Sequence, residues 1–280
     1  MRGRSSRRYA ISRARVGAIG SIVVLASSAA ALGGPQRPQS PASAGDGAMT
    51  RQQVLAVLAA ARGRPDLSAR NLAGLDLNGI DFKDANLSAS VLNGAHLSHA
   101  NLAHCNLTVA FGENGEFRDA DLRGAQMFSM QLQGADLTGA HLDGARLIGD
   151  LTHARLDGAS LEHLRAGADM TNQSMGLMNA RFESATLRNA DLLGANLSRS
   201  DMKFADLSGA KLAGASLFRA DLSGANLRGA DLRHADLRDA TLIDADFTAA
   251  KLTGARFDGA TLRNTQGLDD ARRRGATGLR

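Results

Sequence analysis

The sequence is poor in the residues that usually build compact cores and cross-links. Among its 280 residues there is no tryptophan, one tyrosine, one cysteine and four prolines. A single cysteine excludes an internal disulfide framework. Because aromatic side chains are scarce, any core has to be aliphatic, and each buried leucine would contribute about 1.5–3 kcal/mol to it.

What the sequence has instead is a five-residue rhythm, Ala-(Asp/Asn)-Leu-x-Gly, from about Leu67 to Leu262. This period is neither that of a helix nor that of a simple alternating strand. The Leu, Phe or Met of each unit, here called the centre, follows a small residue by two positions, so both point to the same side of extended backbone. The other three positions are mostly polar and are expected to face water. Four such walls would make a coil of about 20 residues.

This repeat resembles that of the pentapeptide-repeat proteins, written A(D/N)LXX, over about 200 of the 280 residues. The resemblance implies an all-β fold, a right-handed quadrilateral parallel β-helix. Coils stacked at ~4.8 Å would give a rod of roughly 48 Å. The core is expected at the centres, among them Leu87, Leu97, Leu102, Leu122, Leu137, Leu187, Leu192, Leu207, Leu222, Leu227, Leu232, Leu237 and Phe247.

The N-terminus has the order of parts of an export signal. Six arginines within the first 15 residues precede an uncharged stretch, residues 16–32, that contains Ala29-Ala30-Ala31. We therefore predict a cleaved signal peptide over residues 1–32, with a partial twin-arginine motif at Arg7 and Arg8, and an exported or periplasmic protein with no stable membrane span. The alternative is a true translation start at Met49, which would leave the protein in the cytoplasm.

Residues 33–48 carry three prolines and are expected to be a flexible linker. Thr50 and Gln53 have capping-box spacing ahead of an apolar run, so a short capping helix is predicted within residues 49–64, broken by Gly63 and Pro65. The repeat body then spans residues 65–268. Residues 269–280 are expected to form a C-terminal cap or tail.

The formal charge of +5 belongs to the ends of the chain. Residues 1–49 carry +6 and residues 269–280 carry +2, whereas residues 50–268 contain 22 Lys/Arg and 25 Asp/Glu and carry −3. The repeat body is therefore not expected to bind nucleic acid directly.

Two segments disturb the rhythm. Residues 108–116 keep the count but place Gly112 at a centre and Phe111 one position early, which predicts a distorted corner or a small bulging loop. Within residues 148–181 the centres Leu151, Leu156 and Leu161 are displaced by one residue, and the register returns at Phe182. Loops are expected to absorb this slip. They are either a neutral surface insertion or a functional site on a rigid scaffold.

No catalytic, cofactor or metal site is expected. His99, His104 and Cys105 are close in sequence, but the repeat places the two histidines on different walls and the cysteine inside, so they cannot converge on one ion. Arg228, Arg233 and Arg238 fall on three successive walls and circle the rod for the same reason. Positions 20 apart stack, so Asp191, Lys211, Asp231 and Lys251 should form an alternating column of charge.

The sequence favours a non-enzymatic scaffold that binds an unidentified protein through the faces of a rigid rod, with a homodimer left open. Phe128, Phe204 and Phe218 occupy outward positions and are the best candidates for a contact surface. The alternative comes from the family resemblance: some pentapeptide-repeat proteins resemble a DNA duplex and modulate DNA gyrase, including the quinolone-protection type. That function calls for a strongly acidic rod.

Overall fold

The computed structural model describes residues 47–167, 179–269, 271 and 273–279. All of them belong to one compact unit, Ser40–Arg280. The predicted signal peptide and all but the last two residues of the predicted linker lie outside the described residues.

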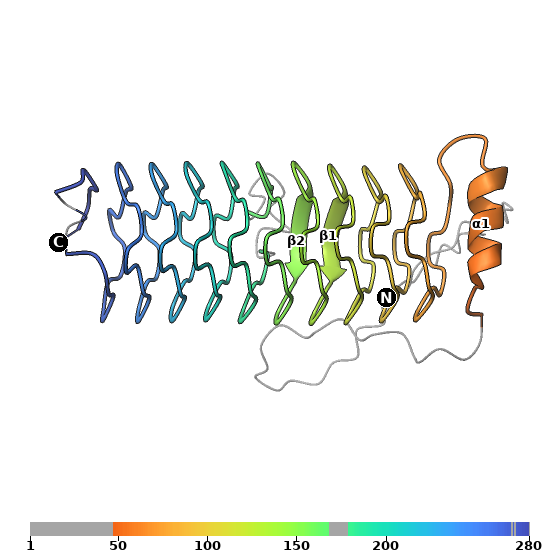
Figure 1. The fold of residues 1–280 in the computed structure, drawn as a ribbon, viewed down its shortest axis with the longest axis horizontal. Coiled ribbons are helices and arrows are strands. Elements are labelled where there is room, and N and C mark those ends of the chain that lie inside the picture. Colours follow the sequence, from red (N-terminus) through yellow and green to blue (C-terminus); the bar gives the residue numbers. More distant parts are fainter. Residues whose placement is uncertain (1–46, 168–178, 270, 272, 280) are drawn as a thin grey trace, which may run out of the picture. The chain divides into compact units, whose positions relative to one another are not determined.

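The helix α1, Arg51–Ala60, begins with the capping box that the sequence predicts. The Gln53 backbone N–H donates to Thr50 Oγ1 (3.2 Å), and the Thr50 N–H donates to Gln53 Oε1 (2.7 Å). The helix ends earlier than the predicted segment, because Ala61 is already extended. Val54 is fully buried against the core. Figure 1 shows α1 at one end of the stack of coils.

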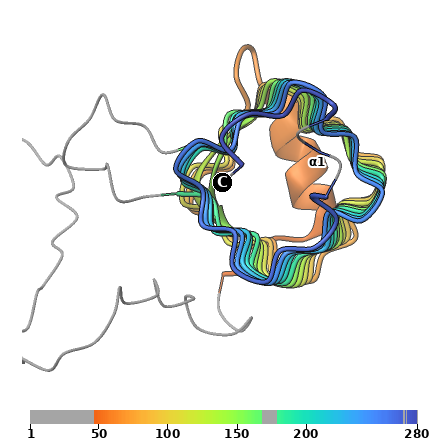
Figure 2. The ribbon, with the colours of Figure 1, turned by 90° about the vertical axis from the view of Figure 1, so that its left-hand side faces the viewer.

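The body is a solenoid of four-walled coils, seen down its axis in Figure 2. Parallel bridges join residues one coil apart, such as Asp201 to Asp221 and Asp221 to Thr241. In the same coils the Leu222 N–H donates to the Thr241 carbonyl (2.8 Å), and the Asp221 N–H donates to the Ser200 carbonyl (3.0 Å). Each wall is therefore hydrogen-bonded to the walls before and after it.

Each wall ends in a tight turn that explains the Gly of the repeat. In one example, the Ala225 N–H donates to the Leu222 carbonyl (3.0 Å), and Gly224 takes a φ of +67°. A positive φ at the third residue of such a turn favours glycine, although Asn, Asp and His also tolerate it. Where the rhythm lacks glycine, residues such as Asn189 and His234 adopt the same conformation.

The Asp or Asn of the repeat satisfies a backbone donor of its own wall. The Ser223 N–H, at the start of a turn, donates to Asp221 Oδ1 (3.1 Å), and the Ser198 N–H donates to Asn196 Oδ1 in the same way (3.1 Å). Asp and Asn favour turns through such local bonds. The polar position is thus part of the fold as well as part of the surface.

The centres and small residues fill the interior. Every centre named above as a core residue, from Leu87 to Phe247, is at most 1% exposed. Cys105 occupies a small-residue position, is fully buried, and places Sγ 3.1 Å from the Phe82 carbonyl oxygen. Burial raises the pKa of this thiol to about 12.

The prediction of a distorted corner or bulge at residues 108–116 is wrong. This wall has regular turns, and Phe111 pairs with Val91 before it and Gln131 after it. The reason is compensation of volume. A Cβ on Gly112 would lie 3.1–3.3 Å from atoms of Leu132, Met130 and Phe117, so these larger side chains occupy the space that a centre normally fills.

The register slip is absorbed by a strand, where the sequence led us to expect loops. Two strands, β1 (Gln126–Gln131) and β2 (Arg146–Asp150), run parallel. Gln126 pairs with Arg146, 20 residues on, but Gln131 pairs with Asp150, only 19 residues on. One residue is therefore missing from β2, and β1 accommodates it by an irregularity between Phe128 and Gln131.

Gly149 makes the shortened wall feasible. A Cβ on this residue would lie 2.2 Å from the Met130 carbonyl oxygen, closer than any real contact. The backbones of β1 and β2 therefore approach so closely at the missing residue that no side chain fits.

The register returns between Arg165 and Arg181, which are 16 positions apart where five are usual, and residues 168–178 of this stretch lie outside the described part. Just before it, Leu164 takes a small-residue position and Ala166 takes a centre, and both are fully buried. Large and small side chains have exchanged places here, which conserves the volume of the core.

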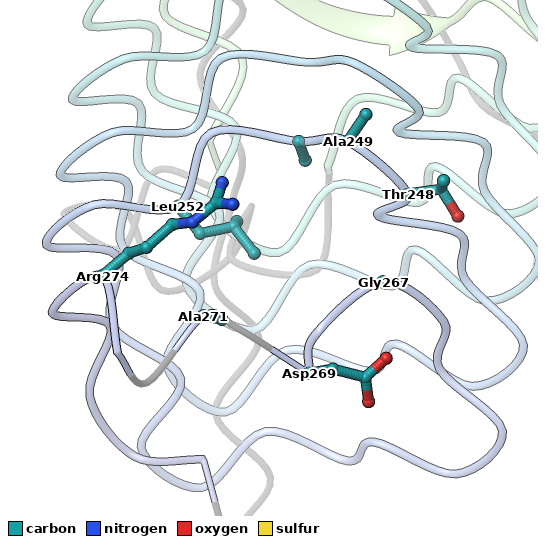
Figure 3. A pocket seen from close by; sticks show the side chains of 8 residues that line it. Thr248, Ala249, Leu252, Gly267, Asp269, Ala271 and Arg274 are labelled. Atoms are coloured by element: carbon teal, nitrogen blue, oxygen red, sulfur yellow. The ribbon is translucent and has the colours of Figure 1, made fainter.

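The C-terminal segment does not form a second helix in its described residues. Turns follow Leu268, and Thr277 then pairs with Arg256 of the preceding coil. Beneath this tail lies a cavity of about 210 Å³, bordered by Leu252 of the core and by Asp269 and Arg274 of the tail (Figure 3). It is smaller than the ~300–1,000 Å³ of typical small-molecule sites.

We predict that Gly149→Ala lowers the free energy of unfolding by about 1–3 kcal/mol or more, because the added Cβ collides with rigid backbone. Gly63→Ala is the matched control, since its Cβ would meet no atom within 4 Å and its φ is ordinary. Urea unfolding of both variants measures the difference. Equal stability of the two variants would show that the close approach at Met130 is not a constraint.

Candidate interaction faces

The columns of paired residues define four faces of the solenoid, each made of one wall from every coil. Face A carries the paired positions Asp66, Asn86, Asn106, Gln126, Arg146, Arg165, Asn196, Ser216, Asp236 and Arg256. Face B carries Asn71, Val91, Phe111, Gln131, Asp150, Arg181, Asp201, Asp221, Thr241 and Thr261. Face C carries Asp76, His96, Glu116, Asp136, Arg155, Thr186, Asp206, Asn226, Asp246 and Gln266. Face D carries Asp81, Asn101, Asp121, His141, Ser160, Asp191, Lys211, Asp231 and Lys251.

The three outward phenylalanines do not form one patch. Phe204 lies on face B and is 63% exposed, with its ring directly over Gly224 of the next coil. Phe128 and Phe218 lie on face A and are half-buried. Guanidinium groups cover them: Arg146 lies 5.9 Å from the Phe128 ring centroid, and Arg219 and Arg238 lie 4.9 and 5.6 Å from that of Phe218. These residues thus belong to two faces, and their role in binding stays a prediction.

The histidines are placed as the repeat predicts. His99 lies on face C and His104 on face D, each at the positive-φ position of its turn, while Cys105 is inside. His96 pairs with Glu116 one coil on (Nδ1 to Oε2, 2.9 Å). Within the described ranges, no group of three or more His, Cys, Asp or Glu side chains is arranged to hold a metal ion.

Most surface charges on faces C and D are used within the solenoid. Arg228 contacts Asp246 (2.9 Å), Arg233 contacts Asp231 (2.6 Å), and these arginines lie on different faces as the repeat predicts. The column of Asp191, Lys211, Asp231 and Lys251 on face D is confirmed by its bridges, and Lys211 Nζ lies 2.8 Å from Asp191 Oδ2. The hydrogen bond from Arg233 lowers the pKa of Asp231, which keeps this carboxylate charged in mildly acidic solution.

Face B has a buried polar cluster beside the shortened wall. Asp150 is only 6% exposed, yet its two oxygens accept from four groups: the Thr152 N–H and hydroxyl, Gln133 Nε2 (3.0 Å) and Arg181 Nη1 (3.1 Å). Arg181 also contacts Glu183 (3.2 Å). Because a buried charge that loses its partner costs several kcal/mol, this cluster fixes the junction of these coils. Its donors are already used within the fold.

The charge is distributed unevenly among the faces. Counting the paired and turn positions that point outward among the described residues, faces B, C and D carry net charges of −3, −3 and −2. Face A carries six arginines and four aspartates, a net charge of +2. Sequence analysis missed this basic face, because the register slip and the use of three different positions hide the alignment of Arg146, Arg165, Arg199, Arg219, Arg238 and Arg256. The bridges of each coil bring them to one side.

The described part of the chain contains no helix with the length and apolar character needed to cross a membrane. The helix α1 has 10 residues.

The pentapeptide-repeat family model matches residues 71–108, 90–129, 120–163, 177–214, 215–254 and 240–266. The chain belongs to the pentapeptide-repeat family. The model covers more than half of the sequence, and the regular turns and bridges of the solenoid extend over the same residues.

Several solved structures of pentapeptide-repeat proteins are similar to this chain. HetL, involved in regulation of heterocyst differentiation in the cyanobacterium Nostoc sp. Strain PCC 7120, is 30% identical over 78% of this chain and 94% of its own, with a TM-score of 0.39. QnrB1, a plasmid-mediated fluoroquinolone resistance protein, is 19% identical over 73% and 97% of the two chains, also with a TM-score of 0.39. A pentapeptide-repeat protein from the Arabidopsis thaliana thylakoid lumen is 22% identical over 71% and 73%, with a TM-score of 0.16. No curated protein matches the sequence.

Proposed function

We propose that this pentapeptide-repeat protein is a non-enzymatic scaffold that binds a protein partner through the faces of its solenoid. The observation that carries the proposal is the division of each unit into inside and outside. Two of every five residues fill the interior, and the other three form surfaces repeated in register from coil to coil. Such a surface is preorganised, so little conformational freedom is lost when a partner binds.

The faces also differ enough to be selective. Faces B, C and D are net acidic and face A is net basic, while Phe204 (63% exposed), Val109 (43%) and Leu193 (42%) add apolar contacts on faces B, A and D. A partner can therefore recognise one side of the rod by charge.

The test is capture of binding partners by the full chain from its own host, with the wild type compared with two variants. Leu222→Asp places a charge in the fully buried ladder and should abolish capture by disrupting the coils. Leu193→Asp places the same charge on an exposed position of face D and should keep the circular dichroism of the wild type. A wild-type chain that captures no protein reproducibly would overturn the scaffold proposal.

A second candidate is a DNA-mimicking modulator of DNA gyrase. The acidic balance of faces B, C and D favours it, but the many Arg–Asp contacts on those faces reduce the negative field that mimicry of a phosphate backbone needs. A supercoiling assay with purified gyrase decides between the candidates. Inhibition at micromolar protein would replace the scaffold proposal with this one.

We also propose that α1 caps the first coil and that the solenoid winds to the right, as the family resemblance implies. The burial of Val54 and the contact of the Arg51 side chain with the Asp76 carbonyl support the capping role. Val54→Asp should lower the free energy of unfolding by a few kcal/mol, whereas the exposed Leu55→Asp should change it little. Equal effects in urea unfolding would argue against the cap, and an experimentally phased crystal structure would decide the handedness.

Export is proposed from the basic and apolar order of residues 1–32. N-terminal sequencing of the protein purified from its host tests it. A mature N-terminus shortly after Ala31 is expected. A first residue at Met49 would instead indicate a cytoplasmic protein with a later start.

A further inference from the structure

Face A contains a band without acidic residues in its described part. From Asn86 to Arg219, the outward positions of this face carry no Asp or Glu. The first coils of the band present small or uncharged side chains, such as Ser88, Ala89 and Thr108. The later coils present Arg165, Arg199 and Arg219 in three successive coils. Positive charge is thus concentrated on one part of one face.

These three arginines are less neutralised than those of the other faces. Arg165 is exposed and donates only a long hydrogen bond to the Gly144 carbonyl (3.5 Å). Arg199 is half-exposed, and its guanidinium has no side-chain partner among the described residues. Arg219 lies against the Phe218 ring and reaches Asp239 at 3.2 Å, so it is both oriented and partly paired. By contrast, Arg233 on face D makes three hydrogen bonds to a single carboxylate.

We propose that this band on face A binds a short acidic segment of a polypeptide partner. The proposal rests on the scaffold function and specifies the chemistry of its partner. Carboxylates of an extended segment would pair with Arg165, Arg199 and Arg219, which lie one coil apart at ~4.8 Å intervals. Arginine suits this role, because its planar guanidinium pairs with carboxylates through two parallel hydrogen bonds.

The length of the band favours a polypeptide over a nucleic acid. Duplex DNA carries a negative charge every ~1.7 Å of its axis, and it would extend well beyond a few coils. Past Arg219, its phosphates would meet Asp236, Asp239 and Asp258 on the same face. On the other side of the arginines, the uncharged coils offer phosphates no counter-charge. A segment only a few residues long avoids both regions.

The experiment measures binding of a short fluorescent peptide of alternating Glu and Ser to the full chain, with a short DNA duplex as a second probe. The test variant is Arg165→Gln/Arg199→Gln/Arg219→Gln. The matched control is Lys211→Gln/Arg233→Gln/Lys251→Gln, which removes the same charge from three successive coils of face D. We expect the peptide affinity to fall about tenfold in the face A variant and less than about twofold in the control. Wild-type binding should weaken as salt is added.

Three results would overturn the proposal: equal loss in both variants, no peptide binding by the wild type at low salt, or tighter binding of the duplex with loss only in the face A variant. The last result would identify a nucleic-acid surface. Circular dichroism of both variants verifies folding, since all six positions lie on the surface. A partner captured from the host that still binds the face A variant would refute this inference and leave the scaffold function intact.

Discussion

The length of the coil constrains the rest of this structure, because the backbone hydrogen bonds of each wall reach the walls one coil before and one coil after it. Asp221 bonds back to Ser200 and Leu222 bonds forward to Thr241, so an added or missing residue shifts two interfaces at once. The side chains repeat because the backbone does. A residue at a given slot meets the same slot of the next coil, which turns a one-dimensional pattern into columns of Leu, Ala and Asp.

Departures from the repeat are tolerated where a neighbouring residue compensates for them. Gly112 leaves a centre empty and Met130 fills it from a position that is normally small. Leu164 and Ala166 exchange sizes within one wall. The deletion in β2 is possible because Gly149 allows two backbones to touch, and the buried Asp150 with its four donors secures the next position. In each case the core keeps its volume and the buried polar groups keep their partners.

The regular part of the fold could be predicted from the sequence because each wall depends only on its own five residues and on identical neighbours. The capping box of α1, the buried centres and the column from Asp191 to Lys251 are confirmed for this reason. The wall at residues 108–116 was predicted wrongly, because Gly112 is compensated by Met130 and Leu132 of the following coil, a contact 18–20 positions away that no local pattern records. The strand solution at Gly149 was missed because a backbone contact leaves no signature beyond the glycine itself.

The basic band on face A was hidden by the same non-local geometry, and its origin explains why a nearly neutral rod can still be selective. Arg165 stands at a paired position and Arg199 at a turn position, and the slip at Gly149 shifts the numbering between earlier and later coils. No fixed spacing in the sequence connects them. In the solenoid, however, acids on faces C and D stand beside the arginines of the same walls and neutralise them, whereas face A lacks acids over several coils. Since interactions between exposed charges decay over ~8 Å at physiological ionic strength, a partner senses the local imbalance of one face rather than the sum over the rod. The net charge of the repeat body therefore describes this surface poorly, and the arrangement of charges around each coil determines what it attracts.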